Sequence, residues 1–467
     1  MSEEIKRINR VIKITNEVSP TLCLAKWYHV TMYMHLGETH SCYHPAPHTI
    51  PENELADNPS VLHNTLHKKK ERALMLVGEK PSGCQYCWNV ESLSDSHISD
   101  RMIKTGSLYR NEMLDEIKQR PWDSNFNPEY IEISFSNECN FKCGYCHPKH
   151  STSYYSEIKQ YGPYKNVLNH ANDIDNFKIY EEDTNPYIKA WWAWWPEMSK
   201  TLNILRITGG EPLLHRTTWK LLDELKRDPK PKLELNFNSN LGASSRIIER
   251  FSNSIKELLD QKMIKDSKVF SSMETWGKRA EYIRTGLKLD LWEKNFHTFV
   301  TTTQRPISIM CTFNILTVTS FIDFLKKMLE WRIKYNDVID FTDGKSLNYR
   351  KIRFDTPYLK EPIQFDMHIL PKEEFLPYFD QILQFINDNR NDADITKFSD
   401  LEYERFRRVR DYYATVQYDQ ARIIEGQRDF YNWFSQYDQR RGLNFLETFP
   451  EMKNFWKLCE HINNQKQ

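Results

Sequence analysis

The chain has 467 residues, of which 39% are hydrophobic and 27% are charged. This balance is typical of a folded globular protein and excludes a disordered chain, and the length allows two to three domains. Lys+Arg and Asp+Glu both number 64, so the formal net charge is zero. A neutral chain lacks the overall basic character of nucleic-acid-binding proteins, and we expect no nucleic-acid partner.

The first residues of the chain include two acidic side chains and lead into no apolar stretch of signal length. No segment approaches the roughly 20 apolar residues that a membrane-spanning helix needs. We therefore expect a cytoplasmic protein with no membrane partner. Because thiols stay reduced in that compartment, the nine cysteines are better explained as metal ligands and buried thiols than as disulfides. Cys311 and Cys459 are expected in the core.

Residues 1–125 are rich in cysteine and histidine and show little regular periodicity. Cys84 and Cys87 have the spacing of a metal-binding knuckle, and Cys23 and Cys42 precede them. Four thiolates can close a metal site completely, as they do in iron–sulfur and zinc centres. The sequence therefore predicts an N-terminal module with a metal site of one of these two kinds.

Residues 126–365 alternate between short strand-like runs and amphipathic helical stretches. Six strands are expected, at 131–135, 202–208, 233–238, 268–273, 309–318 and 351–355. Helices are expected between them at 217–227, 245–262 and 321–335, where apolar residues recur three and four apart. Such alternation is typical of the α/β class and predicts a partial (β/α)6 TIM-like barrel with its site at the carboxyl ends of the strands. Residues 366–467 are expected to form a helical extension, at 372–389 and 401–441.

The first barrel strand leads directly into a loop with three cysteines, Cys139, Cys143 and Cys146. Three thiolates at this spacing can converge on one 4Fe–4S cube and leave its fourth iron open to a small molecule. The segment from Cys143 to His147 also matches the C-x-x-C-H haem-attachment string, but haem leaves Cys139 unexplained and the chain has no export signal. Zinc is a further alternative, with His147 or His150 as the fourth ligand. We favour the iron–sulfur interpretation.

Polar motifs follow the next two strands. Residues 208–213 (TGGEPL) include Gly209 and Gly210, which let a backbone approach a ligand closely, and Glu211, which can accept hydrogen bonds from a charged amine. Ser239 follows the third strand. An ordinary polar turn is the alternative for both segments.

The fourth strand is followed by Glu274 and then by Arg284. A guanidinium suits the recognition of a carboxylate because its planar fork donates two parallel hydrogen bonds. A solvated charge on a helix surface is the alternative for Arg284.

The cysteine loop, with Tyr145 just before its last cysteine, resembles the signature of the radical S-adenosylmethionine (radical SAM) superfamily. The resemblance implies that the open iron binds the amino and carboxylate groups of S-adenosylmethionine (SAM). It also implies that one electron from the reduced cluster cleaves the sulfonium to a 5′-deoxyadenosyl radical, which abstracts a substrate hydrogen. An electron donor such as flavodoxin or ferredoxin is implied as a partner, and the backbone around Tyr145 is expected near the adenine.

The later motifs resemble the same superfamily. Gly209, Gly210 and Glu211 are similar to its GGEP motif, which contacts the methionine amino group of SAM. Ser239 is expected near the ribose or carboxylate, although Ser239-Asn240-Leu241 stands in place of the usual T-N-G. The resemblance further implies that Arg284 pairs with the cofactor carboxylate.

Glu274 departs from the S-x-D string that related enzymes often carry after this strand. It is the one candidate for a catalytic side chain, and the departure leaves its role open.

The N-terminal cysteines resemble the auxiliary-cluster module called SPASM, or its shorter form Twitch. Their order is Cys23, then Gly37-x4-Cys42, then the C-x-x-C of Cys84 and Cys87. Lys26 stands where the related pattern has Pro, and in many members the module follows the barrel rather than preceding it. The resemblance implies a second 4Fe–4S cluster held by these four cysteines, with structural zinc as the alternative.

We therefore expect a radical SAM enzyme that abstracts hydrogen from its substrate. Auxiliary-cluster relatives often modify peptides or proteins, so a peptidyl substrate is the first expectation and a small molecule the alternative. A non-catalytic iron–sulfur or zinc-binding protein is the alternative of a different class. The Gly-Gly-Glu loop argues against it, because a scaffold has no need of an amine-binding loop.

Overall fold

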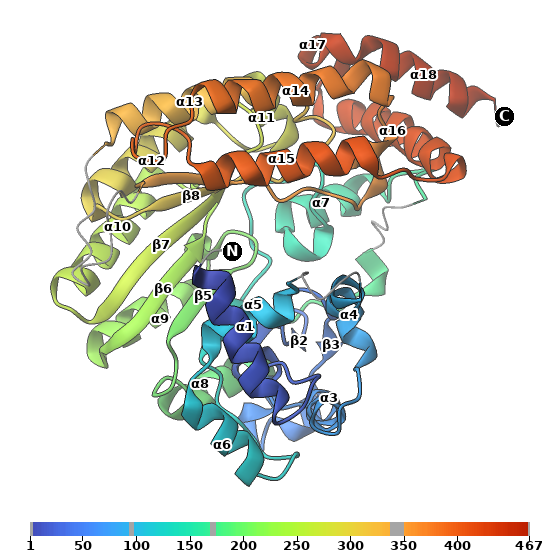
Figure 1. The fold of residues 1–467 in the computed structure, drawn as a ribbon. Helices are drawn as coiled ribbons and strands as arrows, with labels where there is room; N and C mark the ends of the chain where they lie inside the picture. The colour runs from blue at the N-terminus through green and yellow to red at the C-terminus, as the bar shows by residue number, and fades with distance from the viewer. Residues whose placement is uncertain (1–2, 93–97, 169–173, 337–349, 466–467) are drawn as a thin grey trace.

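The computed structural model describes residues 3–92, 98–168, 174–336 and 350–465. Within them, nine strands form one open sheet with the order β3-β2-β1-β4-β5-β6-β7-β8-β9 (Figure 1). The strands β1, β4, β5, β6, β7, β8 and β9 lie side by side in this order, and every neighbouring pair among them is parallel. Strands β2 and β3 extend the β1 edge of the sheet in antiparallel pairs. The strands are β1 His29–Tyr33, β2 Glu38–His40, β3 His48–Thr49, β4 Tyr130–Ser134, β5 Ile204–Thr208, β6 Lys230–Asn238, β7 Ile264–Ser272, β8 Ile307–Met310 and β9 Ile352–Asp355. This mostly parallel open sheet confirms the expected α/β class and partial barrel.

All six expected barrel strands are present, as β4 to β9. The fifth, expected at 309–318, is much shorter in the structure, because regular pairing ends at Met310. The chain stays beside β9 beyond that point through a single bridge between Phe313 and Tyr358. The residues after β8 therefore form a buried loop at the carboxyl edge of the sheet.

The N-terminal region contributes strands to the same sheet as the barrel. β1 pairs with β4 in parallel, with Met32 opposite Ile133, and β2 and β3 extend that edge. The division at residue 125 stays a prediction, but the sheet is continuous across it. The helices of this region are α1 Glu3–Asn16, α2 Ala25–Tyr28, α3 Leu66–Leu76, α4 Gln85–Glu91, α5 Asp100–Leu108 and α6 Asn111–Gln119.

The two faces of the sheet differ in polarity because side chains alternate along each strand. In β5, Leu205 and Ile207 are fully buried, whereas Arg206 and Thr208 point to the opposite face and are only half-buried. No helix in the described part of the chain is long and apolar enough to cross a membrane. The helices of the barrel region are α7 Thr152–Tyr161, α8 Pro186–Met198, α9 Arg216–Arg227, α10 Ser245–Asp260, α11 Lys278–Ile283, α12 Leu289–Thr303 and α13 Phe321–Lys334.

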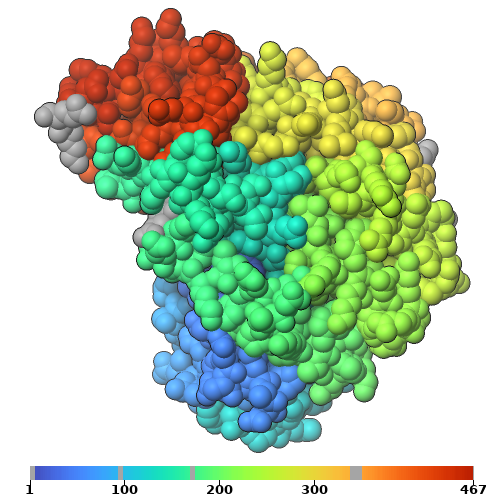
Figure 2. Space-filling view, turned by 180° about the vertical axis from the view of Figure 1, so that it is seen from behind, coloured from blue at the N-terminus to red at the C-terminus, as the bar shows by residue number. Residues whose placement is uncertain are grey.

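The C-terminal part is helical, as expected. The stretch expected at 401–441 is broken after Thr415, and a new helix begins at Gln420 because the Asp419 side chain caps its amino end. Figure 2 shows this extension and the N-terminal region at opposite ends of the molecule, with residues of the barrel between them. The helices are α14 Lys372–Asp388, α15 Asp400–Thr415, α16 Gln420–Arg441, α17 Phe445–Thr448 and α18 Lys453–Asn464.

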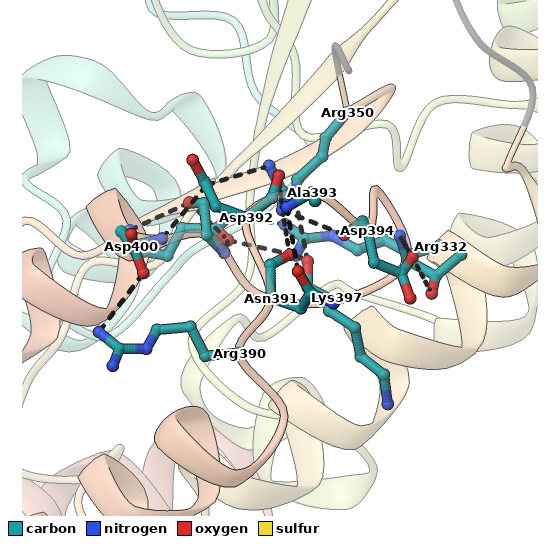
Figure 3. Close-up of polar contacts among 12 residues, drawn as sticks. Arg332, Arg350, Arg390, Asn391, Asp392, Ala393, Asp394, Lys397 and Asp400 are labelled. Atoms are coloured by element: carbon teal, nitrogen blue, oxygen red, sulfur yellow. Dashed lines mark hydrogen bonds and ion pairs between the residues drawn. The ribbon is translucent and has the colours of Figure 1, made fainter. Parts of the chain in front are cut away.

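Arginine side chains fix the loop between α14 and α15 (Figure 3). Arg350 donates hydrogen bonds to the backbone carbonyls of Lys397, at 3.0 Å, and of Asn391 and Asp394, both at 3.1 Å. Arg332 of α13 donates to the Lys397 carbonyl at 2.8 Å. Carbonyl groups that no helix or strand uses are thus satisfied, which ties the extension to the last units of the barrel.

Candidate metal and cofactor sites

The three cysteines of the loop after β4 line one cavity. This cavity has a volume of about 230 Å³ and lies where the loops after β4, β5 and β6 meet. Cys139, Cys143 and Cys146 are each half-buried, and Gly209 and Gly210 share the same wall. The structure therefore brings together the residues of two separate sequence motifs around one space.

Hydrogen-bond donors surround two of these sulfur atoms. The backbone N–H of Phe141 lies 3.4 Å from Cys139 Sγ, and Asn240 Nδ2 lies 3.8 Å from the same atom. Arg284 Nη1 lies 3.5 Å from Cys143 Sγ. Donors around sulfur stabilise thiolates and tune iron–sulfur clusters, so the donor set fits a cluster bound through this triad.

Gly209 and Gly210, after β5, are required because their loop packs closely against the cysteine loop. A Cβ at Gly210 would lie 2.3 Å from the carbonyl oxygen of Glu138, and one at Gly209, whose φ is +128°, would lie 2.7 Å from that of Ser136. Gly210 N–H also donates to the Ser136 carbonyl at 3.2 Å. The absence of a side chain here lets the loop pack directly onto the cysteine loop, while both glycines still face the cavity.

Glu211 joins two loops and does not itself line the cavity. Its buried carboxylate accepts hydrogen bonds from Ser239 Oγ at 2.9 Å and from the backbone N–H groups of Asn240 and Leu213 at 2.6 and 3.1 Å. Burial raises the pKa of Glu211 to about 7, although these hydrogen bonds act in the opposite direction. Glu211 thereby holds Ser239 and Asn240, which do face the cavity.

Arg284 and Glu274 form a buried ion pair beside the cysteine loop. Arg284 Nε donates to Glu274 Oε2 at 2.8 Å, and the Tyr145 hydroxyl donates to Glu274 Oε1 at 2.7 Å. Burial alone would lower the pKa of Arg284, but the Glu274 carboxylate raises it well above its ordinary value. Arg284 is 6% exposed, so the alternative of a solvated charge on a helix surface is wrong.

The cavity also contains residues that were not predicted as cofactor-binding residues. Phe270 and Ser272 of β7 line it, as do His150 and Thr312. Burial lowers the pKa of His150 to about 3, so its imidazole is neutral near pH 7. Phe270 and Ser272 could have been found from alternation in β7, because both lie on the same face near its carboxyl end.

The C-terminal helix α16 holds the cysteine loop from outside. Arg441 donates to the Lys142 carbonyl at 2.5 Å and pairs with Glu157, with 2.9 Å between Nε and Oε2. A Cβ at Gly144 would lie 3.2 Å from the Trp433 ring and 2.9 Å from Phe365. No local pattern could have shown these contacts, because about 300 residues separate the two segments.

The four N-terminal cysteines also line one cavity, which is smaller, about 10 Å³, or room for about one water molecule. Cys23 precedes α2, Cys42 follows β2, and Cys84 and Cys87 lie at the start of α4. Burial raises the pKa of Cys23 and Cys87, and hydrogen bonds from the backbone N–H groups of Ala25 and Arg101 act against that rise. Four thiols around one cavity are the ligand type of a tetrathiolate metal site.

Lys26, Arg101 and Lys104 line this second cavity as well. Within residues 3–92, 98–168, 174–336 and 350–465, no group of three or more His, Cys, Asp or Glu side chains could hold a metal ion as the side chains now stand.

No family model matches the chain. Two curated relatives are similar to it over short segments. The chain is 26% identical over 112 residues to the GTP 3′,8-cyclase of Nautilia profundicola, which is 24% of this chain and 27% of the relative. It is 30% identical over 97 residues to the GTP 3′,8-cyclase of Staphylococcus haemolyticus, which is 21% of this chain and 23% of the relative. The chain therefore matches about a quarter of the length of these relatives.

Solved structures of anSMEcpe with bound AdoMet are distantly similar. A form with a hexahistidine tag matches 55% of this chain and 61% of that chain, with 15% identity and a TM-score of 0.35. A native form matches 70% of this chain and 97% of that chain, with 14% identity and a TM-score of 0.31. In this chain the cysteine triad and the Gly-Gly-Glu loop lie at the carboxyl ends of the neighbouring strands β4 and β5.

Proposed function

We propose that the chain is a radical SAM enzyme whose cysteine triad holds a 4Fe–4S cluster. The observation that carries this proposal is that Cys139, Cys143 and Cys146 line one cavity with the glycines after β5. Three thiolates from a single loop leave one iron of a cube without a protein ligand. A cluster bound there would, when reduced, supply one electron that cleaves SAM to methionine and a 5′-deoxyadenosyl radical, and this radical would take a hydrogen atom from the substrate.

In this proposal the loops around the cavity bind SAM. The cofactor-binding residues are Tyr145, Gly209, Gly210, Glu211, Ser239 and Arg284. Glu211 acts by holding Ser239 in place, since Glu211 is not itself among the residues that line the cavity. Glu274 is a positioning residue rather than a general base, because its carboxylate is engaged by Arg284 and Tyr145.

We further propose that Cys23, Cys42, Cys84 and Cys87 hold a second metal centre. An auxiliary 4Fe–4S cluster of the SPASM or Twitch kind follows from the sequence resemblance, and its role would be electron transfer or stabilisation of the fold. Zinc is the alternative, and the small volume of this cavity favours it. Counts of iron and zinc in purified protein decide between the two metals: about eight irons supports two clusters, and about four irons with one zinc supports the alternative.

The substrate class also stays a proposal. A peptide or protein is the first candidate, by analogy with relatives that carry auxiliary clusters. A small molecule is the alternative. Over about a quarter of their length, two proteins named GTP 3′,8-cyclase match this chain, and that name favours a small-molecule substrate. Flavodoxin or ferredoxin is the proposed electron donor, and the cytoplasm the proposed location.

The test is formation of 5′-deoxyadenosine from SAM by anaerobically reconstituted protein with a strong reductant. The wild type should form it, and Cys143→Ala should not, while Cys459→Ala, which changes a buried cysteine far from the triad in sequence, should behave as the wild type. A wild type that carries a full cluster but forms no 5′-deoxyadenosine would support a non-catalytic iron–sulfur protein instead.

A further inference from the structure

Tyr43 lies between the four-cysteine cavity and the barrel. It directly follows Cys42, and the ammonium of Lys104 lies 4.8 Å from the centre of its ring. Both Cys42 and Lys104 line the four-cysteine cavity. At its other end, the Tyr43 hydroxyl donates a hydrogen bond to Oε2 of Glu132 in β4. Tyr43 is 48% exposed, so these contacts, rather than packing in the core, determine where it lies.

Glu132 in turn contacts Arg206 on the neighbouring strand. The two residues are opposite each other in the β4–β5 pair, and Glu132 Oε2 lies 3.8 Å from Arg206 Nη1. Arg206 Nε donates to Asn238 Oδ1 at 2.8 Å, and the guanidinium carbon lies 4.2 Å from the centre of the Phe270 ring. A carboxylate, an amide and an aromatic ring thus hold the guanidinium in one place.

Asn238 and Phe270 belong to the wall of the cofactor cavity. The backbone carbonyl of Phe270 also accepts a hydrogen bond from the backbone N–H of Ser239 at 2.9 Å. Ser239 lines the same cavity and is one of the proposed SAM-binding residues. A continuous series of contacts therefore leads from the four-cysteine cavity to the cofactor cavity.

We propose that Tyr43, Glu132 and Arg206 couple the four-cysteine metal site to the binding of SAM. This inference rests on both proposed sites. A metal ion bound by Cys42 fixes the backbone of the next residue, and it thereby holds Tyr43 against Glu132. Glu132 then keeps Arg206 in contact with the wall of the cofactor cavity. All three are positioning residues, because they act on that cavity through other side chains.

The coupling depends on the position of Cys42 and not on electron transfer, so zinc and an iron–sulfur cluster would act alike. Coupling between two binding sites is reciprocal. Metal at the N-terminal site should strengthen SAM binding, and bound SAM should strengthen metal binding by the same factor. We expect a factor of about five, near the lower end for coupled sites. Competition with a chelator, with and without SAM, measures the second effect.

The experiment measures the SAM affinity of the anaerobically reconstituted full chain by equilibrium dialysis. Cys84→Ser removes a ligand of the N-terminal site, Tyr43→Phe removes the hydrogen bond to Glu132, and a double variant combines the two changes. Tyr86→Phe is the matched control. Tyr86 also adjoins a cysteine of the N-terminal site, but its ring stacks on His44, with 3.9 Å between the ring centres.

Cys84→Ser and Tyr43→Phe should each weaken SAM binding about fivefold. The double variant should bind SAM no more weakly than either single variant, because both changes break the same connection. Arg206→Met breaks that connection at its other end, and it should likewise abolish the effect of Cys84→Ser. Tyr86→Phe should match the wild type. Losses that multiply in the double variant would show that Tyr43 and the metal act independently, and they would overturn the proposal.

The same measurements separate this inference from the proposals on which it rests. A wild type that carries a full cluster but binds no SAM would refute the proposed function, and equal metal contents in wild type and Cys84→Ser would refute the second metal site. Either result would overturn the inference as well. Equal SAM affinities in wild type and Cys84→Ser, at unequal metal contents, would overturn the inference alone. If Arg206→Met does not fold, the Tyr43→Phe series decides.

Discussion

The carboxylate of Glu274 binds the guanidinium of Arg284, and Nη1 of that guanidinium lies 3.5 Å from the sulfur of Cys143. The pair is buried, and Glu274 is completely inaccessible to solvent. A carboxylate engaged in this way orients the arginine toward the cysteine loop and is not free to take a proton from a substrate.

Glu274→Gln should therefore act on stability and cofactor binding. It leaves the Arg284 cation buried without a carboxylate partner, and we expect the free energy of unfolding to fall by about 3–5 kcal/mol. Chemical denaturation measures this, with the exposed Glu249 changed to Gln as the control. An unchanged stability, together with loss of the acidic limb of the pH–rate profile, would show instead that Glu274 is a base.

Gly210→Ala should displace the cysteine loop, because the new Cβ would lie 2.3 Å from the Glu138 carbonyl oxygen. We expect a loss of about 1–3 kcal/mol in stability, as in other overpacked sites, and a reduced iron content. Gly162→Ala is the control: its φ is +75° but nothing lies within 4 Å of its Cβ, so it measures the cost of backbone strain alone. Equal iron contents in the two variants would contradict the proposed loop contact.

Glu211 should make the stability of the protein depend on pH. Its pKa in the folded protein is raised to about 7, so its contribution is fully present below the pKa of an unfolded glutamate and is lost as pH rises through 7. The difference in unfolding free energy between wild type and Glu211→Gln should shrink between pH 5 and 8, by at most about 1.4 kcal/mol per pH unit. A difference that stays constant over this range would show that Glu211 does not titrate there.

Arg441→Met should destabilise the cysteine loop, which Arg441 contacts from the C-terminal helix α16. It removes the hydrogen bond to the Lys142 carbonyl and leaves Glu157 with Lys142 as its remaining cationic partner. We expect a loss of about 3 kcal/mol in stability, near the lower end for a broken buried pair, and a lower iron content at the triad. Arg440→Met is the control, because Arg440 binds the carbonyls of Gly162 and Pro163 and not the cysteine loop. Equal iron loss in both variants would contradict a specific role for Arg441.

The barrel strands could be predicted from the sequence because local patterning determines them. All six occur, since each alternates or concentrates apolar residues over a short run between helices. β1 was missed, although His29 to Tyr33 alternates at period two. Its partner β4 lies about 100 residues later, and no local signal specifies pairing over that distance.

The cysteines and glycines of the site could be predicted for a related reason: their spacing within short loops carries the chemistry. The contacts that hold these cysteines and glycines in place could not be predicted. Arg441 lies in a helix that has no motif, and Glu211, which was predicted to contact the cofactor amine, instead binds Ser239 and Asn240 in this structure.

The claim that the triad leaves one iron open to SAM is tested most directly by electron paramagnetic resonance of the reduced, reconstituted protein. Adding SAM should change the spectrum of the wild type and of Cys84→Ser, because both retain the triad. The spectrum of a variant with the three triad cysteines replaced by Ala should not change. A wild-type spectrum unaltered by saturating SAM, at full cluster occupancy, would contradict the proposed site.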